Sequence, residues 1–304
     1  MKKVLLTGAS GFVGRHCLTA LVGRGFEVHA VSSKERDPIP TLPQVRWHQA
    51  DLLESAQASH LLAHVRPTHL LHCAWYAAPG KYWNALENFR WVEASLHLLQ
   101  VFVAEGGRRA VSVGTCAEYD WQSGCCSEKS TPLKPATAYG VCKHCLQLML
   151  DALGKLSGLK TAWGRLFFLY GPHEYEERLV ASIIRSILRQ QSALCSHGEQ
   201  IRDFLYVQDA ADALVALLDS EVSGAVNIAS GIPVSLRTVI DEIATQLKRP
   251  DLINFGALAA TESEPPRLVA DVERLRYEVG WAPQYDLARG LAETIKWWKL
   301  QLEK

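Results

Sequence analysis

Near its N-terminus the chain reads Val4-Leu5-Leu6-Thr7-Gly8-Ala9-Ser10-Gly11-Phe12-Val13-Gly14. The apolar run 4–7 predicts a buried strand, and the amphipathic residues 15–22 predict a helix. Gly8 permits a tight turn, Gly11 lets the backbone approach a pyrophosphate, and Gly14 allows close helix–strand packing. Amide groups at the helix N-terminus then face the phosphate charge. A second predicted strand, 27–31, follows at the distance expected for a dinucleotide-binding loop.

Short apolar runs continue to alternate with longer amphipathic runs beyond this loop. The predicted strands are 4–7, 27–31, 70–73 and 110–113, and the predicted helices are 13–22, 56–65, 91–104 and 139–153. This rhythm is typical of the α/β class, with a Rossmann-type, doubly wound parallel sheet. Such sheets bind ligands at the carboxyl ends of their strands.

The rhythm loosens from about residue 170, and Gly171-Pro172 and Glu264-Pro265-Pro266 interrupt it. We therefore predict a dinucleotide-binding Rossmann domain over residues 1–170. A smaller C-terminal α/β domain over residues 171–304 is expected to bind the substrate. Part of 203–230 is expected to pack back on the first domain.

Length and composition narrow the classes of function. The 304 residues are enough for two domains that each bury a core. The 32 Lys and Arg residues balance 32 Asp and Glu residues, so no net positive charge attracts nucleic acid or an anionic membrane. No apolar stretch approaches the roughly 20 residues of a membrane span. We expect a cytoplasmic protein with neither nucleic acid nor membrane as a partner.

The cysteines give no argument for a disulfide scaffold or a metal site. Eight cysteines are too dilute for such a scaffold in a chain of this length. Cys142-Lys143-His144-Cys145 has the spacing of redox and zinc sites, but no second pair stands at comparable spacing. We predict free thiols and no metal.

Cofactor preference depends on the end of the second predicted strand. A site for NAD usually offers a carboxylate there, whereas this chain reads Ser32-Ser33-Lys34-Glu35-Arg36. Hydroxyl groups and cations can hold a 2′-phosphate, which a carboxylate would repel. We predict a preference for NADP(H), with NAD(H) possible. The alternative is a solvated loop whose charges contact nothing.

A candidate catalytic set follows the strand 110–113. Tyr139 and Lys143 are four residues apart, so both lie on one face of the predicted helix 139–153. A phenol has a pKa near 10 and needs a neighbouring cation to relay protons at neutral pH. Lys143 is placed to supply that charge, and the hydroxyl of Thr115 is placed to hydrogen-bond the reacting oxygen.

Together with further motifs, this set resembles a known family. The motifs are residues 7–14, Ala50-Asp51-Leu52, Asn88, Tyr139 with Lys143, Tyr170-Gly171-Pro172, Arg202-Asp203-Phe204, Tyr206-Val207, Asn227 and Gly280-Trp281-Ala282-Pro283. They span nearly the whole chain. The sequence resembles the extended short-chain dehydrogenase/reductase family, also called the NAD-dependent epimerase/dehydratase family, in its branch that modifies nucleotide sugars.

The resemblance implies roles for individual residues. Thr115, Tyr139 and Lys143 would form the catalytic triad. The cofactor would contact Thr7, Gly8, Gly11, Phe12, Val13, Gly14, Ser32, Ser33, Lys34, Asp51, Leu52, Cys73, Ala74, Tyr139 and Lys143, with Asp51 and Leu52 at the adenine. A nucleoside-diphosphate sugar would contact Trp75, Tyr76, Thr115, Cys116, Tyr119, Arg202 and Arg267. The two arginines are equally compatible with surface cations or salt-bridge partners.

Other features bear on the substrate and the assembly. Trp75, Tyr76 and Tyr119 are chosen as pocket residues from a larger group of aromatic residues after strand ends, which also includes Tyr82, Trp83 and Trp121. The resemblance also implies a homodimer, in which helices 91–104 and 139–153 of two chains form a four-helix interface.

Two departures from the family pattern narrow the reaction. Thr115-Cys116-Ala117 stands where 4,6-dehydratases typically carry Thr-Asp-Glu, which disfavours dehydration. Phe168 stands where many members have Asn before Tyr-Gly-Pro, which leaves the placement of the substrate open. We predict NADPH-dependent reduction of a nucleoside-diphosphate keto sugar, at C4 of a 4-keto-6-deoxyhexose.

Two alternatives to this reduction remain. The first is an NAD-dependent nucleotide-sugar epimerase, in which the cofactor removes and returns a hydride without net redox change. The second is a cofactor-binding regulator without turnover, against which the intact set of Thr115, Tyr139 and Lys143 argues.

Overall fold

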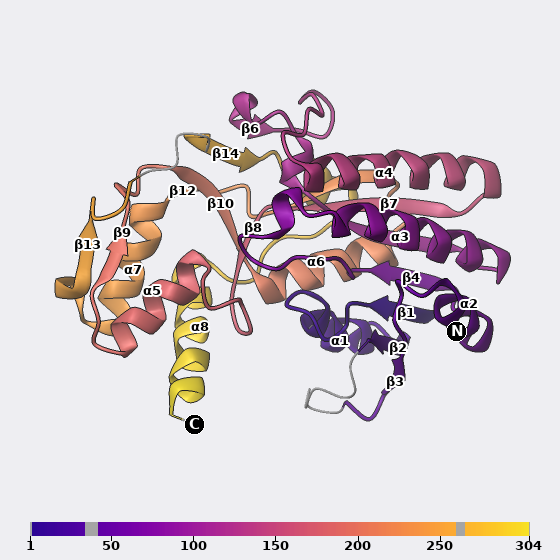
Figure 1. Cartoon of the computed structure of the whole chain (residues 1–304), viewed down its shortest axis with the longest axis horizontal. Helices are drawn as coiled ribbons and strands as arrows, with labels where there is room; N and C mark the ends of the chain where they lie inside the picture. Colours follow the sequence, from indigo (N-terminus) through magenta and orange to yellow (C-terminus); the bar gives the residue numbers. More distant parts are fainter. Residues whose placement is uncertain (1, 34–41, 260–264, 304) are drawn as a thin grey trace.

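The computed structural model describes residues 2–33, 42–259 and 265–303. Its largest element is a sheet of seven parallel strands in the order β11-β7-β5-β4-β1-β2-β3, here called the central sheet (Figure 1). The strands are β1 (Lys3–Thr7), β2 (Glu27–Ser32), β3 (Val45–Gln49), β4 (His69–His72), β5 (Arg109–Thr115), β7 (Lys160–Leu166) and β11 (Gly224–Ile228). The predicted Rossmann-type, doubly wound parallel sheet is therefore confirmed. Strand order reverses between β1 and β4, the place where such sheets bind ligands.

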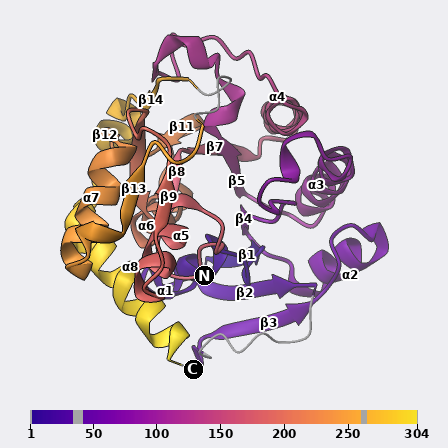
Figure 2. The same cartoon turned by 60° about the vertical axis from the view of Figure 1, so that its left-hand side comes forward.

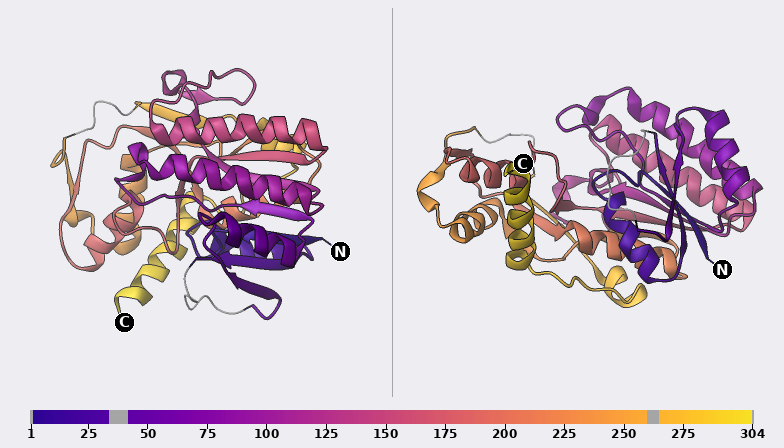
Figure 3. Two further views of the ribbon diagram at one scale, coloured as in Figure 1. Left: turned by 45° about the vertical axis from the view of Figure 1, so that its right-hand side comes forward. Right: turned by 90° about the horizontal axis from the view of Figure 1, so that it is seen from below.

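Helices cover both faces of the central sheet. They are α1 (Gly14–Gly23) and α6 (Val207–Asp219), which pack together, and α2 (Ser55–Val65), α3 (Glu87–Ala104) and α4 (Ala138–Ser157), which pack in sequence order. Figure 3 shows α3 and α4 running side by side. Because both faces are covered, central strands read as continuous apolar runs, and every residue of β5 is buried. Helix α3 begins at Glu87, four residues before the predicted start.

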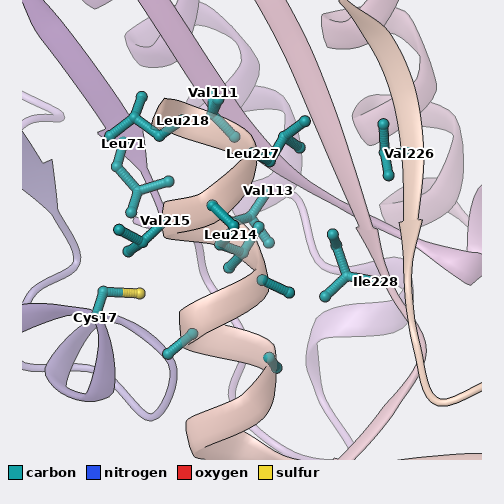
Figure 4. Packing of buried hydrophobic residues seen from close by; sticks show 14 of the residues in the cluster. Cys17, Leu71, Val111, Val113, Leu214, Val215, Leu217, Leu218, Val226 and Ile228 are labelled. Atoms are coloured by element: carbon teal, nitrogen blue, oxygen red, sulfur yellow. The ribbon is translucent and has the colours of Figure 1, made fainter. Parts of the chain in front are cut away.

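Helix α6 supplies much of the core on its side of the sheet. Its Leu214, Leu217 and Leu218 are fully or almost fully buried. Figure 4 shows these side chains directed at Val111 and Val113 of β5, among other strand residues. Residues 207–228, which form α6 and β11, thus belong structurally with the N-terminal half of the chain.

In the C-terminal region, residues 167–259 and 265–303 form smaller sheets and, apart from α6, three α-helices. Its strands are β8 (Phe168–Tyr170), β9 (Ala193–Cys195), β10 (Ile201–Tyr206), β12 (Pro233–Ser235), β13 (Ile253–Phe255) and β14 (Arg267–Ala270), and β14 also pairs with β6 (Cys125–Cys126). The helices are α5 (Leu179–Leu188), α7 (Leu236–Leu247) and α8 (Leu287–Leu302). Figure 2 shows them gathered on one side of the molecule, where they share an apolar core.

The structure also bears on the cysteines and on membrane-spanning helices. All eight cysteines are free thiols. Across residues 2–33, 42–259 and 265–303, no helix combines the length and apolar character needed to cross a membrane.

Candidate active site

The glycine loop between β1 and α1 is shaped by close backbone contacts. Gly8 has a φ of +65°, and a Cβ there would lie 2.8 Å from the Ala74 nitrogen. A Cβ on Gly14 would lie 2.1 Å from the Gly8 carbonyl oxygen, so the loop folds tightly onto the start of α1. A Cβ on Gly11 would have one neighbour within 4 Å, the Gly8 carbonyl oxygen at 3.1 Å. The open side at Gly11 fits the backbone approach of a dinucleotide pyrophosphate.

The other predicted cofactor residues follow neighbouring strands at the same edge of the sheet. Phe12 and Val13 lie in the glycine loop, Asp51 and Leu52 follow β3, and Cys73 and Ala74 follow β4. Ser32 ends β2, with its hydroxyl oxygen 3.3 Å from that of Ser10, and Ser33 is exposed. Arg15 donates a hydrogen bond of 2.7 Å to the Ser10 carbonyl. Lys34 lies outside the described residues.

A buried histidine joins this loop to the rest of the sheet. His72, at the end of β4, is 2 % exposed. Its Nδ1 lies 2.7 Å from the Thr7 hydroxyl, and its Nε2 lies 2.8 Å from the Ser95 hydroxyl on α3. Thr7 in turn accepts a hydrogen bond from the Ala74 amide at 3.2 Å. Burial lowers the pKa of His72 to about 3, so the ring is neutral in the folded protein.

We expect His72 to make the protein less stable in mild acid. Because its pKa is lowered on folding, the stability it contributes is present above about pH 6.5 and is lost as pH falls towards its folded pKa. The free energy of unfolding should fall by about 2 kcal/mol from pH 7 to pH 5 through this group alone. Denaturant unfolding of His72→Gln should show a correspondingly smaller pH dependence. His60→Gln, at an exposed position, is the control, and equal pH dependence in the two variants would contradict the assignment.

The structure brings Thr115 and Tyr139 together. Thr115 is the last residue of β5, and Tyr139 lies in the first turn of α4, which Thr137 caps by accepting a hydrogen bond from the Gly140 amide. A Cβ on Gly140 would lie 2.4 Å from the Ala117 carbonyl oxygen, so α4 docks closely on the turn after β5. The Thr115 side chain hydrogen-bonds the Tyr139 phenol.

Aromatic side chains surround the Tyr139 ring. The ring centroid of Tyr82 is 4.9 Å away and that of Trp83 is 5.9 Å away, both in edge-to-face geometry. Burial raises the pKa of the phenol, and the hydrogen bond with Thr115 offsets this only in part. The phenol is therefore held in its protonated form. Tyr82 and Trp83 are not among the predicted pocket residues; their only signal in the sequence is an aromatic pair in the loop after β4.

Lys143 is 3 % exposed and is held by two other elements. Its ammonium donates a hydrogen bond of 2.7 Å to the Val113 carbonyl of β5, and it lies 3.8 Å from the centroid of the Trp75 ring. The indole of Trp75 donates to Asn88 at 2.9 Å. Burial lowers the pKa of Lys143 to about 7, although the Glu118 charge opposes the shift. Trp75, predicted to contact substrate, thus lies against Lys143.

The remaining predicted substrate residues lie in different parts of the fold. Tyr76 is partly buried after β4, and the thiol of Cys116 is buried beside Thr115. Tyr119 is 1 % exposed and donates a hydrogen bond of 2.8 Å to Asn227, which holds its hydroxyl in the core. Arg202 is buried on β10 and donates to the Pro265 carbonyl at 2.8 Å, whereas Arg267 is exposed on the neighbouring β14.

A cleft of about 600 Å³ opens beside this aromatic group. Its lining comprises residues 78–83, from the loop after β4, and Tyr175, Glu177 and Arg178, from the segment before α5. The Arg178 guanidinium lies 5.8 Å from the centroid of the Tyr82 ring. The cleft thus combines aromatic surface, on which a sugar can stack, with the cations Lys81 and Arg178 and the carboxylate of Glu177.

Comparisons with known proteins agree with this architecture. The sequence profile described as the NAD dependent epimerase/dehydratase family matches residues 4–229. UDP-glucose 4-epimerase of Rhizobium meliloti is 26% identical over 97% of this chain and 96% of its own length. The dTDP-6-deoxy-L-talose 4-dehydrogenase (NAD(+)) of Aggregatibacter actinomycetemcomitans is 26% identical over 80% of this chain and 90% of its own. The structure of MoeE5 in complex with UDP-glucuronic acid and NAD superimposes with a TM-score of 0.83 at 27% identity, covering 98% of this chain and 99% of MoeE5.

Proposed function

The chain belongs to the NAD dependent epimerase/dehydratase family, and we propose that its reaction is the NADPH-dependent reduction of a nucleoside-diphosphate keto sugar. The substrate we propose is a 4-keto-6-deoxyhexose, reduced at C4. The family contains enzymes that modify nucleotide sugars. In this chain Tyr139, one of the set with Thr115 and Lys143, packs against Tyr82 and Trp83 of the cleft lining.

The placement of the Tyr139 ring against Tyr82 and Trp83, which line the cleft, is the observation that carries this proposal. Burial raises the pKa of its phenol, and the Lys143 ammonium is engaged by the Val113 carbonyl. A neutral phenol donates a proton, which reduction requires at the new alkoxide. Epimerisation begins instead with oxidation of a hydroxyl, for which the same oxygen must accept a proton.

Each residue of the set has a defined part in the proposed reduction. A bound nicotinamide would supply the hydride. Thr115 would hold the substrate carbonyl by a hydrogen bond, and Tyr139 would give its phenolic proton to the developing alkoxide. Lys143 would hold the nicotinamide ribose. To bind the ribose, the Lys143 ammonium would either release the Val113 carbonyl or donate hydrogen bonds to the carbonyl and the ribose together.

The residues that follow Thr115 offer no free carboxylate for water elimination. Cys116 and Ala117 follow Thr115 and carry no carboxylate, and the thiol of Cys116 is buried with its pKa raised by that burial. The next acid, Glu118, is fully buried and bonded to Arg165. Epimerisation remains the second candidate. The nearly full-length similarity to UDP-glucose 4-epimerase supports it, since the same three residues would serve that reaction.

We infer that NADP(H) is preferred, with its adenosine 2′-phosphate at the end of β2. Ser10 and Ser32 place two hydroxyl groups together there, and Arg15 is bonded to the Ser10 carbonyl. Ser32 and Ser33, the described residues at that strand end, carry no carboxylate to favour the ribose of NAD.

The reaction is tested with purified protein, NADPH and a panel of dTDP-, CDP- and GDP-linked 4-keto-6-deoxy sugars, with NADH in parallel. Stoichiometric loss of NADPH with one reduced sugar establishes the reductase and names the nucleotide. Inversion at C4 of the corresponding 4-hydroxy sugars, supplied with NAD and without net change in the cofactor, establishes the epimerase. Tight NADPH binding without turnover on the corresponding keto and hydroxy sugars would favour the regulator.

We also propose a homodimer formed through α3 and α4. Apolar side chains are exposed along these neighbouring helices, with Leu86 78% exposed just before α3, Phe89 57% on α3 and Leu148 55% on α4. Light scattering at micromolar concentration should give twice the mass of one chain. Phe89→Glu should give a monomer, and Leu194→Glu, at an exposed apolar position on β9, should stay dimeric. A monomeric wild-type protein would refute the proposal.

A further inference from the structure

A charged pair lies inside the protein beside the candidate active site. Glu118 and Arg165 are 0% and 1% exposed, and the Arg165 Nε donates to a Glu118 carboxylate oxygen at 2.7 Å. Desolvation makes such a pair costly, and an apolar pair of similar volume is often equally stable or more stable. Stability alone therefore does not explain the pair.

Each residue of the pair also forms hydrogen bonds with groups outside the pair. The Glu118 carboxylate accepts the Thr115 amide at 2.8 Å and the Trp163 indole at 2.9 Å. The Arg165 guanidinium donates to Tyr119 at 3.0 Å and to Gln147 at 2.7 Å.

These bonds connect the two elements that carry the proposed catalytic groups. Thr115 ends β5, and Gln147 lies on α4 one turn beyond Lys143. A continuous chain of charge-assisted hydrogen bonds thus runs from the Thr115 amide through Glu118 and Arg165 to α4. The space is closely filled, since a Cβ on Gly114 would lie 2.6 Å from a Glu118 oxygen.

We propose that Glu118 and Arg165 are positioning residues that fix Thr115 relative to the helix carrying Tyr139 and Lys143. This inference rests on the catalytic roles given above to those three residues. The planar guanidinium bonds Glu118 and Gln147 from different nitrogens, so movement of α4 is transmitted to the end of β5. Small displacements of reacting groups cost large factors in rate.

The link is tested at Gln147, away from the reacting atoms. Gln147→Met keeps the side-chain length but removes the oxygen that Arg165 bonds. Asp151→Asn is the matched control, because Asp151 accepts a hydrogen bond from the Gln147 amide nitrogen at 3.3 Å and Asn keeps an oxygen that can accept the same bond. Gln147→Met should lower kcat by about 10- to 100-fold with KM changed less than twofold, and Asp151→Asn should leave both near wild type. Circular dichroism confirms that both variants are folded.

A second readout needs no substrate. Amide hydrogen exchange of the segment 113–119 should be faster in Gln147→Met than in Asp151→Asn, although residue 147 lies on another element. Unchanged exchange there would overturn the inference, whatever the reaction. Wild-type kcat in folded Gln147→Met would also overturn it and would leave the proposed reduction standing. If wild type turns over none of the sugars, the proposed reduction fails, and the exchange measurement still decides the positioning role.

Discussion

Replacing Tyr139 by Phe is expected to lower turnover about 1,000-fold, because the phenol is the proton donor to the developing alkoxide. The aromatic ring and its contacts with Tyr82 and Trp83 are retained, so the site should keep its shape. Binding of NADPH should change only a few-fold, because the phenol is one of many expected cofactor contacts. Initial rates with the best substrate of the panel, together with cofactor titration by fluorescence, measure both quantities.

Tyr82→Phe is the matched control for this change. The same atom is removed from the adjacent ring, which contacts Tyr139 edge-on and lines the cleft. A change of less than about tenfold is expected, since the Tyr82 hydroxyl has no part in proton transfer. Turnover by Tyr139→Phe at more than a tenth of the wild-type rate would rule out the phenol as the proton donor.

Replacing Ser32 by Asp is expected to reverse cofactor preference. The new carboxylate at the end of β2 would repel the 2′-phosphate of NADPH and accept hydrogen bonds from the free ribose hydroxyls of NADH. The ratio of kcat/KM for NADPH to that for NADH should fall about 100-fold, because NADPH binding is weakened while NADH forms a new charge-assisted hydrogen bond. Steady-state rates with each reduced cofactor measure the ratio.

The control for this change is Ser32→Ala, which removes the hydroxyl that lies 3.3 Å from that of Ser10 without adding charge. It should weaken NADPH binding only a few-fold, as expected for one neutral hydrogen bond. The assignment of the 2′-phosphate to this strand end fails if Ser32→Asp leaves the ratio unchanged, or if the wild-type protein uses NADH better.

Features set by local spacing were predictable from the sequence. The spacing of Gly8, Gly11 and Gly14 already dictates the tight turn and the close packing that the structure shows. The alternation of strands and helices dictates a parallel sheet with its ligand edge at the strand ends. Thr115 and Tyr139 meet because one ends a central strand and the other begins the helix that docks beside it.

Features that depend on contacts between distant segments were not predictable. The direction of the Lys143 ammonium depends on Val113 and Trp75, which lie on other elements. Tyr119 follows a strand end like the pocket residues, yet Asn227, 108 residues away, takes its hydroxyl into the core. Nothing in the sequence near Glu118 indicates its ion pair, because its partner Arg165 lies 47 residues further along the chain.

Because α6 and β11 follow residue 200 in the sequence, one face of the central sheet is covered only late in synthesis. Helix α6 and strand β11 are the last parts of that sheet layer to leave the ribosome, after the first elements of the C-terminal region, β8 to β10, have been made. Until then the face of β5 that carries Val111 and Val113 lacks the leucines that cover it in the finished protein (Figure 4). A nascent chain that ends near residue 170 therefore presents an uncovered apolar sheet. Such an intermediate is prone to aggregate or to engage chaperones before synthesis is complete.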